Sequence, residues 1–118
     1  MAGPIRMDPA MELEVNVVVR TPHVVNYRIW TRVPEDEWQV VADGESRDSA
    51  PDHQSLGALS RGTEIAYWFA VGGNPHTRYV ALLLLSQGGK LLIGGDLLHQ
   101  GKVSGKGAAE VTGSVELI

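Results

Sequence analysis

The sequence predicts an all-β fold, a two-sheet antiparallel β-sandwich of immunoglobulin-like or fibronectin-like type with about seven or eight strands. Apolar and polar residues alternate with a period of two in most of its longer segments, as in a strand with one buried face. Clusters of Gly, Pro, Asn and Asp separate these segments at short intervals. No run of ten or more residues has the spacing of apolar residues that is typical of a helix. A small β-barrel or a jelly roll is the alternative architecture.

The size and composition of the chain favour one domain. Its 118 residues, 43% of them apolar, are enough for a single hydrophobic core, and without cysteine that core has to hold by packing alone. Residues 1–11 contain two prolines and a glycine without periodicity, which predicts a flexible N-terminal arm. Residues 12–118 are expected to form the sandwich domain.

Charge and hydropathy exclude two classes of partner. A net charge of −4 and an isoelectric point near 5.5 argue against nucleic-acid binding, which requires a basic surface. No apolar run approaches the roughly 18 residues of a membrane span, and the N-terminal segment lacks the apolar centre of a secretory signal. We therefore expect a soluble cytoplasmic protein with no membrane span, or a secreted one whose signal has been removed.

The first half of the chain predicts one strand and one hairpin. Residues 12–19 alternate in hydropathy and form the first strand. Residues 24–33 and 38–43 are rich in β-branched and aromatic residues, and we expect them to pair across a polar turn with Ile29 facing Ala42. This register assigns six side chains to the core face: Val25, Tyr27, Ile29, Val33, Trp38 and Val40.

Turn residues and the alternation of apolar and polar residues also predict the structure of the segments after residue 43. Residues 44–59 are expected to form a long crossing loop with one short strand near its end, and residues 97–107 an exposed loop or weak edge. Residues 109–117 alternate cleanly and predict a last strand with one solvated face. The central stretch, residues 63–90, holds two long apolar segments that we expect to pair as a hairpin across a turn at 72–75.

The predicted central hairpin has an apolar surface on both faces. Its inner layer would contain Ile65, Tyr67, Phe69, Val80, Leu82 and Leu84. In a sheet with one solvated face, the outer layer carries polar residues, but the outer layer of this hairpin contains no charged residue. If the predicted register were shifted by one residue, the two faces would be exchanged and both would still be apolar. This second face is expected to be covered by the same chain, to contact another copy or a partner, or to line a small apolar ligand cavity.

The leading functional hypothesis is a non-enzymatic protein-binding or assembly module that forms a homodimer or larger oligomer through this outer face. The interface candidates are Trp68, Tyr79, Ala81, Leu83, Leu85 and Leu92. The alternative is a carbohydrate-binding or small-ligand-binding module centred on Trp30, which lies between Arg28 and Arg32 on the outer face of the first hairpin. Arginine stacked on tryptophan is also stabilising without any ligand.

Catalytic and metal-binding signals are weak. The only compact set of candidate catalytic residues lies in one polar loop, where such residues gather as turn formers: Asp48, Ser49, Asp52, His53 and Ser55. The four histidines, His23, His53, His76 and His99, lie in or beside predicted loops without close metal-ligand spacing. A metal site would require two of them to meet Asp52 or Asp96 at one end of the sandwich. We predict no catalytic residues, no metal and no cofactor.

Overall fold

The computed structural model describes residues 4–19, 23–47, 52–92 and 97–118. Every helix or strand element in these ranges is a β-strand, which confirms the predicted all-β class. The described residues form nine strands: β1 (Glu12–Val19), β2 (Val24–Arg32), β3 (Gln39–Arg47), β4 (Asp52–Ala58), β5 (Glu64–Gly72), β6 (Arg78–Gln87), β7 (Lys90–Leu91), β8 (Leu98–Lys102) and β9 (Ala108–Glu116).

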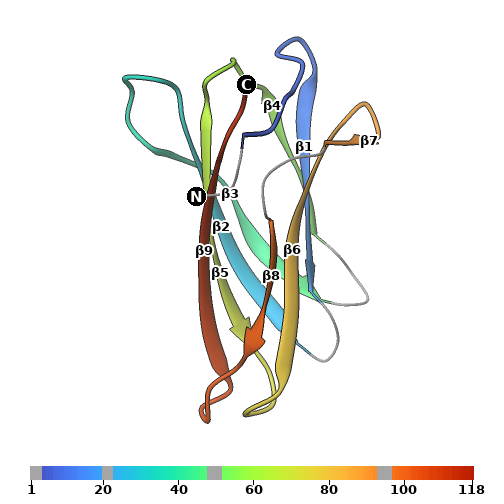
Figure 1. Ribbon diagram of the computed structural model, residues 1–118, viewed down its shortest axis with the longest axis vertical. Helices are drawn as coiled ribbons and strands as arrows, with labels where there is room; N and C mark the ends of the chain where they lie inside the picture. The colour runs from blue at the N-terminus through green and yellow to red at the C-terminus, as the bar shows by residue number, and fades with distance from the viewer. Residues whose placement is uncertain (1–3, 20–22, 48–51, 93–96) are drawn as a thin grey trace.

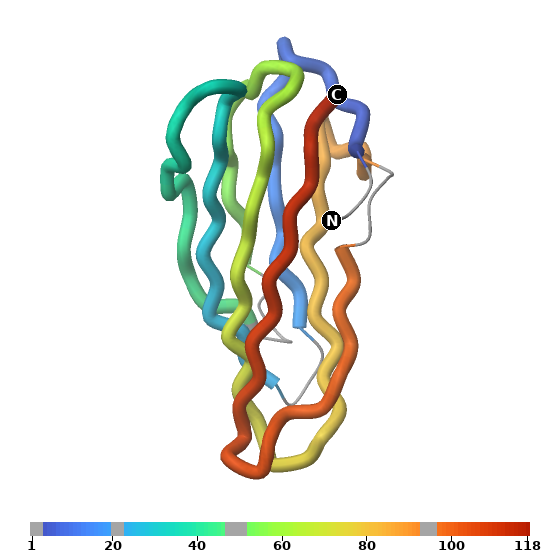
Figure 2. The backbone as a smooth tube through the Cα atoms, turned by 60° about the vertical axis from the view of Figure 1, so that its left-hand side comes forward, coloured from blue at the N-terminus to red at the C-terminus, as the bar shows by residue number. Residues whose placement is uncertain are grey.

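The strands form two antiparallel sheets that pack face to face, so the predicted sandwich is confirmed (Figure 1, Figure 2). One sheet has the order β3-β2-β5-β9. The other has the order β4-β1-β6, and both β7 and β8 pair with the outer edge of β6. The strands run along the longest dimension of the molecule, 43 Å (Figure 1). Because β1 and β2 lie in different sheets, the strand order differs from that of an immunoglobulin constant domain, where the first two strands are neighbours.

The core lies between the sheets and follows the period-two pattern of the sequence. Alternate side chains of the four central strands, β1, β2, β5 and β6, point inward and are buried. Burying one large apolar side chain of this kind stabilises a fold by about 2 kcal/mol. The inward residues of these strands include Leu13, Val15, Val17, Val19, Val25, Tyr27, Ile29, Ile65, Tyr67, Phe69, Val71, Tyr79, Ala81, Leu83 and Leu85.

The first predicted hairpin is confirmed as β2 paired with β3, and Ile29 faces Ala42 as expected. A β-bulge follows this pair, because Trp30 faces Val40 and leaves Val41 as the extra residue. The bulge moves Val40 to the outer face, where its side chain is 52% exposed. The prediction that Val33, Trp38 and Val40 belong to the core is therefore wrong, since all three are exposed near the end of the hairpin.

The predicted central hairpin is wrong, because its two segments lie in different sheets. β5 pairs with β2 and β9, whereas β6 pairs with β1, β7 and β8. The turn after β5 therefore crosses from one sheet to the other, a separation of about 10 Å. Facing β5 across the core, β6 presents its odd-numbered residues inward, and Val80, Leu82 and Leu84 point away from the core that the sequence assigned to them.

Two segments contain more strand than expected. The short strand predicted near the end of the crossing loop is β4, but the second half of β3 also lies within that predicted loop. In the segment predicted as an exposed loop or weak edge, β8 is an edge strand that pairs with β6. The arm differs from the expected flexible segment at Ile5 and Met7, which are buried. Ile5 forms a parallel bridge with Leu117, and its backbone N–H donates to the Glu116 carbonyl at 2.9 Å.

The three tyrosines of the chain share one arrangement, in which each faces a glycine on the neighbouring outer strand of its sheet. The pairs are Tyr27 with Gly44, Tyr67 with Gly113 and Tyr79 with Gly101. In each pair the ring lies over the glycine, because a Cβ atom added to the glycine would contact the ring closely. The glycines thus provide room for buried aromatic rings, at positions where a glycine otherwise weakens a strand.

Two of these tyrosines connect the sheets at opposite edges of the sandwich. The Tyr27 hydroxyl donates a hydrogen bond to the Asp52 carboxylate on β4 and accepts one from Gln54 Nε2 at 3.1 Å. The Tyr67 hydroxyl shares a hydrogen bond with His99 Nε2 on β8, an edge strand of the other sheet. Each sheet edge is therefore joined to the opposite sheet by a buried phenol.

Candidate functional site

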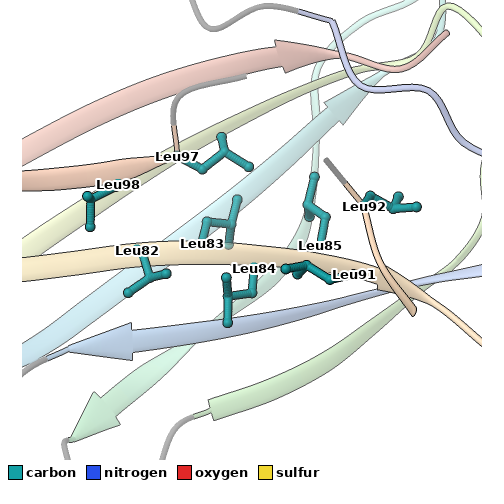
Figure 3. A pocket seen from close by; sticks show the side chains of 8 residues that line it. All are labelled: Leu82, Leu83, Leu84, Leu85, Leu91, Leu92, Leu97 and Leu98. Carbon is teal, nitrogen blue, oxygen red and sulfur yellow. The ribbon is translucent and has the colours of Figure 1, made fainter. Parts of the chain in front are cut away.

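The outer surface of the five-stranded sheet is apolar across several strands. Val18 on β1, Leu82 on β6 and Leu98 on β8 form one row across it, because Leu82 pairs with both neighbours. Together with their neighbours on the same face they form a surface that we call the leucine face: Val18, Val80, Leu82, Leu84, Leu91 and Leu98. In Figure 3, Leu82, Leu84 and Leu98 point to one side of the sheet, and Leu83, Leu85 and Leu97 point to the other.

The leucine face is partly open to solvent. Leu91 and Leu98 are 52% and 45% exposed, and the other four residues are half-buried by their neighbours in the sheet. A hollow of about 170 Å³ opens between β7 and β8 at the edge of β6 (Figure 3). As far as the structure describes the chain, its lining consists of eight leucines, which offer no polar side chain to a water molecule or a polar ligand.

Charged residues lie at the two ends of the leucine face and carry opposite signs. Glu12 and Glu14 are at the end where β1 begins. Arg78 and Lys102, which face each other across β6 and β8, are at the other end. Among the described residues neither of these two cations has a carboxylate within 4.0 Å. The apolar centre thus has an acidic rim at one end and a basic rim at the other.

Four of the six interface candidates lie in the core and not on a surface. Tyr79, Ala81, Leu83 and Leu85 are at most 8% exposed, so the prediction that they face outward is wrong. The cause is the placement of β6 in the opposite sheet, which reverses the expected faces of that strand. Leu92 is half-buried against the core. The sequence did indicate that β6 is apolar on both sides. The side of β6 that points away from the core is the one that belongs to the leucine face.

Trp68 and the ligand-binding candidates lie together on the outer face of the four-stranded sheet. Arg28 faces Trp68 across β2 and β5, and Trp30 faces Ala66 one row further along. The arginines already have partners. Arg32 Nη2 lies 2.5 Å from Glu64 Oε2 and its guanidinium stacks over the Trp38 ring at 4.6 Å, while Arg28 Nη2 lies 4.0 Å from Asp43 Oδ2.

The outer face of the four-stranded sheet also differs from the leucine face in composition. Its edge strand β9 alternates to polar residues there, with Glu110, Thr112 and Glu116 exposed. Two half-buried tryptophans interrupt the polar pattern with large apolar groups, and so does Val40, which the bulge places opposite Trp30. This face is that of a solvated sheet with a small aromatic platform.

The histidines are dispersed over the molecule. His23 is buried and its Nε2 donates to the Thr77 hydroxyl at 2.8 Å, because that hydroxyl donates to the Asn74 carbonyl. His53 Nε2 lies 3.5 Å from Glu14 Oε1 and its Nδ1 is 3.0 Å from Asn16 Oδ1. Within the described ranges, no three His, Asp or Glu side chains gather as a metal ion would require.

The predicted polar-loop cluster is only partly described. Asp48, Ser49 and Asp96 lie outside the described residues. Asp52 is bonded to Tyr27, and His53 points to the opposite face of β4, toward Asn16. The structure therefore does not bring Asp52 and His53 together.

In the part of the chain that the structure describes, no helix is long and apolar enough to cross a membrane. No protein-family model, no curated protein and no solved structure was found that matches this chain.

Proposed function

We propose that this protein is a non-enzymatic assembly module that self-associates through the leucine face. The supporting observation is the continuity of six apolar side chains over β1, β6, β7 and β8, on the side of the sheet that points away from the core. A solvated sheet face alternates to polar residues, as β9 does in the other sheet. Contiguous apolar surface of this kind marks an interaction site in a folded protein.

The arrangement of the leucine face resembles the organisation of a protein interface. Its apolar centre is surrounded by polar and charged residues, as in interfaces whose centre loses water on binding while the rim stays solvated. Burial of a leucine contributes about 2 kcal/mol, so Leu82, Leu84, Leu91 and Leu98 would supply the main driving force. A second copy offers the same apolar surface, and a two-fold axis makes one such patch complementary to itself.

Replacement of Leu82 by aspartate tests this proposal. We expect Leu82→Asp to raise the dimer dissociation constant at least about 100-fold, because each dimer would bury two unpaired carboxylates in an apolar interface. Sedimentation equilibrium from about 1 to 100 μM covers the relevant range of dissociation constants. The matched control is Thr112→Asp, which adds the same charge at an exposed position on the other sheet.

Circular dichroism and thermal unfolding establish that both variants are folded. If the wild-type protein sediments as a monomer throughout this range, or if Leu82→Asp and Thr112→Asp behave alike, self-association through the leucine face is wrong.

A second candidate function is carbohydrate binding at the platform of Trp30 and Trp68. It is favoured by the adjacency of their rows on β2 and β5, with Ala66 and Ala70 as small neighbours on the same face. Flat aromatic side chains of this kind suit the apolar face of a sugar ring. We expect the protein to bind glycans on an array, and we expect this binding to be lost in Trp30→Ala. It should be kept in Trp38→Ala, because the guanidinium group of Arg32 already stacks on the Trp38 ring. An array without any bound glycan would remove this candidate.

A further inference from the structure

We propose that the second copy packs on the leucine face about a two-fold axis that passes through Leu82, lies in the plane of the interface and is perpendicular to the strands. This arrangement brings Arg78 of each copy to Glu14 of the other. It rests on the proposed self-association and specifies its geometry. The supporting observations are the separation of charge along the strands and the symmetry of β6 about Leu82.

The two ends of β6 are equally distant from Leu82 and differ in charge. Arg78 and Ser86 each lie four residues from Leu82, which at about 3.3 Å per residue is about 13 Å in opposite directions. Glu14 on β1 faces Ser86. A rotation of 180° about the proposed axis therefore places Arg78 over Ser86 of the second copy. Glu14 of that copy is then about 5 Å to the side, within reach of a guanidinium group.

The same rotation matches five of the six side chains of the leucine face with apolar partners, and the sixth, Leu91, lies over the long aliphatic stem of Lys102 of the second copy. Leu82 meets Leu82 of the second copy, and Val80 meets its Leu84, so the centre of the contact is formed only by aliphatic groups. Val18 and Leu98, the two neighbours of Leu82 in its row, each meet their own counterparts at the sides. Aligned packing of two sheets tolerates the rotation of about 30° that strand twist introduces between them.

The alternative two-fold axis, parallel to the strands, is disfavoured by charge. It would place Arg78 beside Arg78 of the second copy and Glu14 near Glu14. Like charges that face each other across an interface are destabilising, whereas complementary charges fix the register of two partners. Arg78 has no carboxylate partner among the described residues, so a carboxylate from a second copy would be its first.

Charge reversal tests the direction of the axis. We expect Glu14→Lys and Arg78→Glu each to raise the dimer dissociation constant about tenfold, because each dimer contains the altered contact twice. The double variant should return to within about threefold of the wild type, since the contact is restored with its charges exchanged. Glu110→Lys on the other sheet and Lys106→Glu in the turn before β9 are the matched controls, because they change the net charge equally at exposed positions away from the contact.

Sedimentation equilibrium separates this inference from the proposed function. If Leu82→Asp abolishes self-association while both charge reversals leave it unchanged, or while the double variant fails to recover, the leucine face is the interface and this axis is wrong. If Leu82→Asp has no effect, the proposed function itself fails. Weakening by both single variants with recovery in the double variant establishes the perpendicular axis.

Discussion

Replacement of Gly113 by alanine is expected to lower the free energy of unfolding by about 3 kcal/mol, at the upper end of the usual cost of overpacking a core. A Cβ atom at this position would lie 2.8 Å from Tyr67 Cε1 and still closer to Cζ and the hydroxyl oxygen. The ring cannot move aside easily, because Tyr67 is only 2% exposed and its hydroxyl is bonded to His99. Thermal unfolding should show a melting temperature about 10 °C lower.

Gly72→Ala is the matched control for this prediction. Gly72 is also a strand glycine, but the nearest atom to its added Cβ is the Gly107 carbonyl oxygen at 4.0 Å. Alanine there should be neutral or stabilise the fold by about 0.5 to 1 kcal/mol, since it reduces the conformational freedom of the unfolded chain. Equal effects of the two substitutions would show that the cost comes from the backbone and not from the Tyr67 ring.

The sequence alone was sufficient to predict which residues of three of the central strands face the core. Period-two alternation identified the inward side chains of β1, the first part of β2 and β5, because the other face of each strand is mostly polar or small, with Val18 and Trp68 as exceptions. The predicted faces of β3 before Ala42 are wrong, because the bulge shifts β3 by one residue against β2. A bulge adds one residue without changing the composition of the segment, so the alternation gave no sign of it.

The sheet to which β6 belongs was not predictable from alternation. Its segment is apolar on both faces, and a glycine-rich turn before it suits a hairpin as well as a crossing between sheets. Whether the turn forms a hairpin or a crossing depends on which strands pair with the two edges of β6. These strands are β1, which is distant from β6 in the sequence, and β8, whose sequence resembles a loop. The candidate surface therefore moved from Leu83 and Leu85 to Leu82 and Leu84, while its apolar character was expected.

The tyrosine–glycine pairs depend on register in the same way. Gly44 and Gly113 appear in the sequence as residues that weaken a strand or begin a loop. Their role becomes clear only when pairing places them opposite Tyr27 and Tyr67. Cross-strand contacts of this kind are set by tertiary structure, so local patterns do not reveal them.

Alkaline pH is expected to destabilise the protein through Tyr27. Burial, followed by the hydrogen bond to the Asp52 carboxylate, raises the pKa of Tyr27 from 10.0 to about 12. A raised pKa means that the folded state holds its phenolic proton more tightly than the unfolded state. The resulting stability is complete below pH 10 and is lost as the pH rises from about 10 to about 12. At pH 11.5 the loss should be about 2 kcal/mol.

Tyr27→Phe provides the control that isolates this group from the other tyrosines and the lysines. Phenylalanine retains the ring over Gly44 but has no proton to lose, so the difference in unfolding free energy between wild type and variant should shrink by about 2 kcal/mol between pH 9 and pH 11.5. Urea unfolding at the two pH values measures it. A difference that does not change with pH would mean that Tyr27 titrates alike in both states. The hydroxyl would then be open to water, and the Tyr27–Asp52 contact would not join the two sheets at this edge.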